Sequence, residues 1–257
     1  MPRAWRSPTA IVTASRRRGA QRHPGSAAAS GGGRAPVTPL LAYDIVPPTV
    51  PGGLPWYCLI LHGLGDSRHG WQPVAPMLSL PQLGFVFAEA PNPYHDGFSW
   101  FDLSPEFAPD PDQVRSSRAA LVRLIDHLLD ELDLPSERLF ILGFSQGCLM
   151  TLDVGLRSPR RFAGLVGISG FMCLLEEFPA AFTPATRQQQ VLLTHGRSDP
   201  LIPIAHTRAQ KDRLVALGVA LTWREYAKAH HLDVPGELDD IRAWLLARIA
   251  TGARLGA

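Results

Sequence analysis

Ser145 stands at the centre of Gly143-Phe144-Ser145-Gln146-Gly147, a G-x-S-x-G pattern. An apolar run of strand type at residues 139–142 precedes this pattern, and a helix-like pattern follows it at once. A sharp turn from strand to helix needs glycines, because the backbone is too crowded there for a Cβ atom. Such a turn lifts a serine hydroxyl clear of the sheet and points the free N–H groups of the new helix towards whatever the serine attacks. The order therefore predicts that Ser145 is a nucleophile. The alternative is a serine that only caps a helix.

A serine hydroxyl needs a base to remove its proton and a third group to orient that base. Two later strand-like runs end in suitable residues. Residues 191–195 lead into Gly196-Arg197-Ser198-Asp199-Pro200, and residues 220–226 lead into Ala227-Lys228-Ala229-His230-His231. The carboxyl ends of parallel strands meet at one edge of a sheet. We therefore predict that Asp199 orients the base, although Asp-Pro is also a good turn dipeptide.

Two adjacent histidines, His230 and His231, compete for the role of base, and only one can fill it. We predict His231, because it precedes the last predicted helix by a loop of the expected length. His230 is then expected to be a packed neighbour or a residue that supports the base.

The tetrahedral intermediate of acyl transfer needs N–H donors for its oxyanion. One should be the backbone N–H of Gln146, the residue after the nucleophile. The other is expected from the loop His62-Gly63-Leu64-Gly65-Asp66, which follows the apolar run 56–61, and we assign it to Leu64. The same glycines would also suit a tight strand-to-helix turn with no catalytic role.

Strand-like runs alternate with helical patterns along most of the chain. Strands are predicted at 37–46, 56–61, 84–88, 139–143, 165–169, 191–195 and 220–226, and helices at 72–78, 114–133, after Ser145, at 205–217 and at 237–249. This alternation predicts an α/β fold with a mostly parallel central sheet and helices on both faces.

Composition divides the 257 residues into two parts. Residues 1–37 are rich in Ala, Ser, Gly, Pro and Arg and contain no acidic residue, so we expect a disordered extension before a single domain at 38–257. The extension could be a transit peptide, a basic arm that contacts polyanions or a dispensable segment, and we favour the last.

Several function classes are disfavoured by the same composition. The formal charge of +2 arises from the amino-terminal arginines, so there is no nucleic-acid footprint. No segment approaches the ~20 apolar residues of a membrane span. The cysteines, Cys58, Cys148 and Cys173, lie in apolar surroundings and are expected to be buried free thiols, which favours the cytoplasm. His62, His195 and His206 lack metal-ligand spacing, so neither a metal site nor a cofactor is expected.

Together these motifs resemble the phospholipase/carboxylesterase family, which includes acyl-protein thioesterases and small bacterial carboxylesterases. The resemblance runs from about Tyr57 to Leu246 and rests on five segments: Leu61–Asp66, His69-Gly70-Trp71, Gly143–Gly147, His195-Gly196 with Asp199, and His231. It implies a Ser-Asp-His hydrolase of the α/β-hydrolase fold with little or no lid domain, and oxyanion donors at Leu64 and Gln146. Three features depart from the family: Cys148 replaces a glycine, His230 occupies the place of the glycine before the catalytic histidine, and residues 98–102 match only loosely.

The predicted function is therefore a serine hydrolase that cleaves small carboxylic esters or thioesters through an acyl-serine intermediate, without metal or cofactor. A binding or scaffold protein on the same fold and an acyltransferase with the same triad remain as alternatives. Trp100, Phe171 and Met172 are candidates for an apolar substrate pocket, although isolated apolar residues more often belong to a core. The sequence leaves the oligomeric state open between monomer and homodimer.

Overall fold

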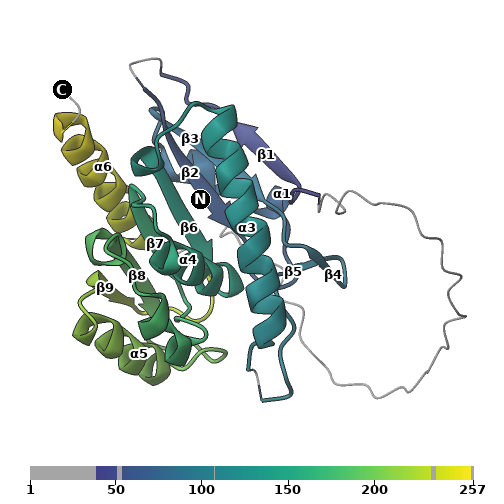
Figure 1. The fold of residues 1–257 in the computed structure, drawn as a ribbon. Helices are drawn as coiled ribbons and strands as arrows, with labels where there is room; N and C mark the ends of the chain where they lie inside the picture. Colours follow the sequence, from purple (N-terminus) through teal and green to yellow (C-terminus); the bar gives the residue numbers. More distant parts are fainter. Residues whose placement is uncertain (1–38, 51–53, 107, 233–235, 256–257) are drawn as a thin grey trace, which may run out of the picture.

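The computed structural model describes residues 39–50, 54–106, 108–232 and 236–255 (Figure 1). Within them, strands form a seven-stranded sheet in the order β1-β3-β2-β6-β7-β8-β9. Only β1 runs antiparallel to its neighbour. The strands span Tyr43–Val46 (β1), Trp56–Leu61 (β2), Leu83–Ala88 (β3), Leu139–Phe144 (β6), Gly164–Ile168 (β7), Gln190–Gly196 (β8) and Ala220–Tyr226 (β9).

Helices cover both faces of this sheet. They span Arg68–Trp71 (α1), Val74–Leu78 (α2), Pro111–Glu131 (α3), Gln146–Arg157 (α4), Ile204–Ala216 (α5) and Glu237–Leu255 (α6). Side chains of α3, α4 and α5 belong to one hydrophobic core, and side chains of α1, α2 and α6 belong to the other. Figure 1 shows α3 and α4 on the near face of the sheet and α6 at its far left side. The result is an α/β-hydrolase fold with helices on both sides of a mostly parallel sheet.

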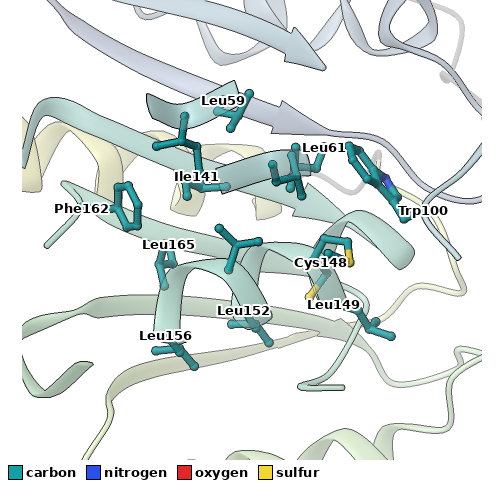
Figure 2. Close-up of a cluster of buried hydrophobic side chains, with 14 of the residues drawn as sticks. Leu59, Leu61, Trp100, Ile141, Cys148, Leu149, Leu152, Leu156, Phe162 and Leu165 are labelled. Atoms are coloured by element: carbon teal, nitrogen blue, oxygen red, sulfur yellow. The ribbon is translucent and has the colours of Figure 1, made fainter. Parts of the chain in front are cut away.

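The central strands are apolar along their whole length because both of their faces are covered. Every residue of β2, β3 and β6 is buried, whereas the edge strands β1 and β9 hold no fully buried position. Figure 2 shows the core on the α4 side, where Leu59 and Ile141 of the sheet face Leu152 and Leu156 of the helix. Continuous apolar runs of this kind are typical of strands in a parallel sheet.

Helix α3 illustrates how local sequence sets the ends of an element. Asp110 accepts hydrogen bonds from the backbone N–H groups of Asp112 and Gln113, and Pro111 occupies the first turn, where its missing N–H costs nothing. Apolar residues at helical spacing, including Leu121, Leu124 and Leu128, are buried against the sheet.

The predicted fold class and the predicted order of strands and helices are confirmed. The sequence did not indicate the β4–β5 hairpin at Asn92–Tyr94 and Gly97–Ser99, or the short 3-10 helices at Ser136–Arg138, Leu175–Ala181 and Thr186–Gln188. The predicted extension at 1–37 lies outside the described residues. In the part of the chain that the structure describes, no helix combines the length and the apolar character needed to cross a bilayer.

Candidate active site

Ser145 lies in a strained turn between β6 and α4. Its backbone has φ 53° and ψ −119°, a conformation that non-glycine residues rarely adopt. A Cβ atom on Gly143 would lie 2.1 Å from the carbonyl oxygen of Gly147, and a Cβ atom on Gly147 would lie 2.0 Å from that of Leu61. Both glycines of the pattern are therefore required by close approach of backbone to backbone, as the sequence predicted.

His230 connects this serine to an acid. Its Nε2 atom lies 2.8 Å from Ser145 Oγ, and its Nδ1 atom lies 2.7 Å from Asp199 Oδ2. The ring also packs against Phe144, with 4.9 Å between ring centroids. An ionised carboxylate accepts hydrogen bonds only, so Nδ1 carries the proton and Nε2 accepts the hydrogen bond that the serine hydroxyl donates. This is the arrangement in which an imidazole can take the serine proton.

The carboxylate of Asp199 is held in place from both oxygens. Oδ1 accepts hydrogen bonds from the backbone N–H groups of Leu201 and Ile202, and Oδ2 accepts one from His230. Burial tends to raise the pKa of Asp199, but the hydrogen bonds and the nearby imidazole outweigh burial and lower its pKa below the ordinary value. Asp199 therefore stays ionised at neutral pH and can stabilise an imidazolium.

The prediction that His231 is the base is wrong: the structure places His230 in that position. The imidazole of His231 folds back on its own loop, where its Nε2 atom accepts a 3.4 Å hydrogen bond from the N–H of Ala229. The backbone carbonyl of His231 accepts a hydrogen bond from Lys228 Nζ. The loop after β9 thus directs two consecutive side chains to different places, and the earlier one reaches Ser145.

The two predicted oxyanion donors belong to segments that meet beside Ser145. A Cβ atom on Gly63 would lie 3.4 Å from Ser145 Cβ, so the loop that carries Leu64 passes next to the nucleophile. Gln146 is the first residue of α4, where backbone N–H groups have no partner within the helix. Among the described residues, neither the N–H of Leu64 nor that of Gln146 donates to another group. Both remain available to a ligand.

His62 fixes the shape of the loop that carries Leu64, a role that the sequence did not indicate. Its Nε2 atom accepts a hydrogen bond from the N–H of Ala90, so Nδ1 carries the proton and donates to the carbonyl of Gly63 at 2.7 Å. Burial lowers the pKa of His62 and keeps the ring neutral. Asp66 holds the far end of the loop by accepting hydrogen bonds from the N–H of Ser67 and from the indole of Trp71.

The side chain of Gln146 has a second task, which is to hold the segment 99–101. Its Oε1 atom accepts from the N–H of Trp100 and from the hydroxyl of Ser99, and its Nε2 atom donates to the carbonyl of Phe101. Trp100 is fully buried, and its indole donates to the carbonyl of His62. Figure 2 shows Trp100 at the end of the core beyond Leu61.

This placement corrects the prediction of the substrate pocket. Trp100 and Met172 are core residues, with 0% and 1% of their surface exposed, so neither offers a surface to a substrate. Phe171 is partly buried and lies edge-on against His206, with 4.6 Å between ring centroids. Of the three pocket candidates, Phe171 alone keeps an accessible face.

His195 lies next to Asp199 and stabilises the turn that follows this residue. Its Nε2 atom donates to the carbonyl of Ile202 at 2.8 Å and lies 3.5 Å from Asp199 Oδ2. Burial lowers the pKa of this histidine, so the ring is neutral. His195 thereby braces the turn whose backbone N–H groups hold Asp199.

Cysteines and metal ligands do not compete for the chemistry of this site. Cys58, Cys148 and Cys173 are buried free thiols, as predicted, and burial raises the pKa of Cys148 above its ordinary range. Cys148 is therefore a core residue rather than a second nucleophile. Over the described residues, no group of three or more His, Cys, Asp or Glu side chains is arranged to hold a metal ion.

Comparison with known proteins identifies the family. The family model described as "Phospholipase/Carboxylesterase" matches residues 57–249, which include every residue of the site described above. The chain belongs to the phospholipase/carboxylesterase family. The match covers the strands β2 to β9 and most of α6, so the family assignment applies to the whole sheet apart from β1.

Individual proteins that resemble this chain carry related names. The chain is 35% identical over 170 residues to acyl-protein thioesterase 1 of Schizosaccharomyces pombe. This alignment covers 61% of this chain and 74% of that protein. It is similar to the crystal structure of acyl-protein thioesterase 2 of Zea mays, with a TM-score of 0.68 and 25% identity over 80% of this chain and 98% of the other. The crystal structure of esterase PE8 has a TM-score of 0.74 at 23% identity, over 81% of this chain and 99% of that one, and supports the fold.

Proposed function

We propose that this protein hydrolyses carboxylic esters or thioesters, with Ser145 as nucleophile, His230 as general base and acid, and Asp199 as the group that orients the imidazole. The observation that carries the proposal is the continuous hydrogen-bonded line from Ser145 Oγ through His230 to Asp199, at 2.8 and 2.7 Å. Membership of a family whose relatives are named thioesterases and esterases supports the same reaction class.

Acylation follows from the geometry. As Ser145 Oγ attacks the substrate carbonyl carbon, His230 Nε2 takes the hydroxyl proton and the carbonyl oxygen becomes an oxyanion. The backbone N–H groups of Leu64 and Gln146 are the donors that we assign to this oxyanion. When the tetrahedral intermediate collapses, the bond to the leaving alcohol or thiol breaks and His230 returns the proton to the leaving group.

Deacylation repeats these steps with water. His230 Nε2 takes a proton from water while the water oxygen attacks the acyl-Ser145 carbonyl, and the collapse of the second intermediate releases the acid and restores the serine hydroxyl. Asp199 stabilises the imidazolium in both halves without itself becoming protonated. No step needs a metal or a cofactor. We place the reaction in the cytoplasm, because the three cysteines are free thiols.

The test measures hydrolysis of p-nitrophenyl butyrate and of butyryl-coenzyme A by the parent protein and by Ser145→Ala. We expect both activities in the parent and a loss of several powers of ten in kcat in the variant, as is typical when a triad member is removed. Labelling of the parent by a fluorophosphonate, located on Ser145 by peptide mass spectrometry, checks the nucleophile directly. Equal hydrolysis by Ser145→Ala would refute the assignment, and an unlabelled, inactive parent would favour a binding protein.

A further inference from the structure

Lys228 is a buried cation next to the candidate base, and the reaction proposed above does not use it. It follows β9, and its side chain is 0% exposed. The side chain of Glu237, in the first turn of α6, is also 0% exposed, and both of its carboxylate oxygens lie 2.7 Å from Lys228 Nζ. The same Nζ donates to the carbonyl oxygen of His231 at 2.8 Å. The cation therefore connects the start of a helix with the backbone directly after His230.

The backbone of Lys228 makes a second connection, to the loop that carries the acid. Its carbonyl oxygen accepts a hydrogen bond from the N–H of Ser198, the residue before Asp199. The two loops also touch at Gly196, where a Cβ atom would lie 2.4 Å from the carbonyl oxygen of Lys228 and 2.6 Å from that of Ala229. Lys228 thus sits at the junction of the acid loop, the base loop and α6.

Stability alone does not call for a charged pair at such a junction. Taking two charges out of water is costly, and replacing a buried ion pair by apolar residues of similar volume is often neutral or stabilising. Hydrogen bonds to a carbonyl, however, fix the direction of a loop in a way that apolar contacts do not. The imidazole of His230 has to stay within hydrogen-bond distance of both Ser145 and Asp199. The direction of the loop therefore decides whether both hydrogen bonds can form.

We propose that Lys228 and Glu237 are positioning residues that hold the loop of His230 in its catalytic geometry, with Glu237 fixing the ammonium and the ammonium fixing the carbonyl of His231. This inference rests on the proposed function, because it assigns a role towards the base of that reaction. It requires that loss of the pair lowers kcat more than it alters KM or stability.

The decisive variant is Lys228→Met/Glu237→Leu, which removes both members of the 2.7 Å ion pair together. The matched control is Lys211→Met/Asp212→Asn, which removes the chain's other lysine and its carboxylate neighbour on α5, where the two side chains are 22% and 70% exposed. For p-nitrophenyl butyrate we expect the Lys228/Glu237 variant to lose about tenfold or more in kcat while KM stays within about twofold, the pattern of a lost transition-state interaction. Its Tm should stay near that of the parent, and the control should match the parent in every parameter.

Rescue by a conservative change tests whether a cationic donor is needed at position 228. Lys228→Arg keeps a cationic donor for both Glu237 and the carbonyl of His231, and it should retain more of kcat than Lys228→Met. In proton NMR spectra, the low-field signal of the His230 Nδ1 proton should be present in the parent and weakened in the Lys228/Glu237 variant. If the pair had only a structural role, its loss would lower Tm. The folded protein would then keep both its kcat and the low-field signal of the His230 Nδ1 proton.

Each remaining outcome also decides the question. An unchanged kcat in a folded Lys228→Met/Glu237→Leu protein overturns the proposal, and so does failure of both this variant and Lys228→Met to fold, because the pair would then serve folding. A parent protein that shows no ester hydrolysis refutes the proposed function instead. In that case the NMR signal of His230, compared between the parent and the Lys228/Glu237 variant, still tests whether the pair positions the imidazole.

Discussion

Replacing each of the two adjacent histidines by alanine, one at a time, gives the sharpest test of the site. His230 is hydrogen-bonded to Ser145 Oγ at 2.8 Å and to Asp199 Oδ2 at 2.7 Å, whereas His231 receives a 3.4 Å hydrogen bond from its own loop. Among the described residues, no other side chain is hydrogen-bonded to Ser145 Oγ, so His230→Ala leaves the serine without a base.

The expected loss for His230→Ala follows from the two proton transfers that the imidazole performs. Removal of a triad histidine lowers kcat by about 10⁶ in a serine protease, and a tenfold change corresponds to about 1.4 kcal/mol. An activated ester with a good leaving group depends less on proton return, so we expect at least about 10⁴, or roughly 5.5 kcal/mol of transition-state stabilisation. His231→Ala leaves the hydrogen bond between His230 and Ser145 in place and should keep kcat within about tenfold.

The assay is hydrolysis of p-nitrophenyl butyrate under saturating substrate, with circular dichroism to verify that both variants are folded. Fluorophosphonate labelling gives an independent measure, because phosphonylation also requires an activated Ser145 hydroxyl. A loss of about 10⁴ in His231→Ala with near-parent activity in His230→Ala would refute the geometry of this loop. Equal, small losses in both variants would refute the proton relay itself.

Three further changes probe the surroundings. Asp199→Asn should lower kcat by about 10⁴ with little change in KM, because an amide favours the wrong imidazole tautomer; near-parent turnover would contradict this role. Glu225 accepts hydrogen bonds from both Nε and Nη2 of Arg208, and these bonds lower its pKa to about 2. The ionised carboxylate therefore stabilises the folded protein above its ordinary pKa, and this stability is lost as the pH falls from about 4.5 towards 2. Urea unfolding at about pH 5 and pH 3 should therefore show a smaller drop for Glu225→Gln than for the parent, and equal drops would contradict the pair. Gly147→Ala places a Cβ atom 2.0 Å from the carbonyl oxygen of Leu61, so we expect roughly 1–3 kcal/mol or more of destabilisation and loss of activity, measured by thermal unfolding and turnover.

The elements that carry Ser145 could be predicted because their constraints are local. Residues of β2 and β6 are apolar without interruption because the strands are buried on both faces, and this pattern is visible in the sequence. The glycines at 143 and 147 mark a turn whose crowding comes from neighbouring backbone. Asp199 could be found because a buried strand ends just before it.

The segment 92–101 could not be predicted, because distant backbone determines its shape. Strands β4 and β5 are three residues each, too short for an alternation of apolar and polar residues to be recognised in the sequence. A Cβ atom on Gly97 would lie 2.3 Å from the carbonyl oxygen of Gly65, and the N–H of Trp100 donates to the side chain of Gln146. Trp100 thus becomes a core residue through contacts with Gln146 at the start of α4 and with the carbonyl of His62 in the loop after β2, although the sequence made it a candidate for the substrate pocket.

The choice between His230 and His231 shows where sequence reasoning stops. Side-chain direction alternates along β9, but that rule ends with the strand at Tyr226, and the next residues take their direction from other loops. Ser198 holds the carbonyl of Lys228, and the Lys228 side chain holds the carbonyl of His231, so contacts from the acid loop and from α6 set which imidazole faces Ser145. A one-residue shift in this loop would exchange the two histidines while leaving every local pattern unchanged. The identity of the base is therefore a tertiary property, and the residues that fix it are the ones whose replacement should separate kcat from stability.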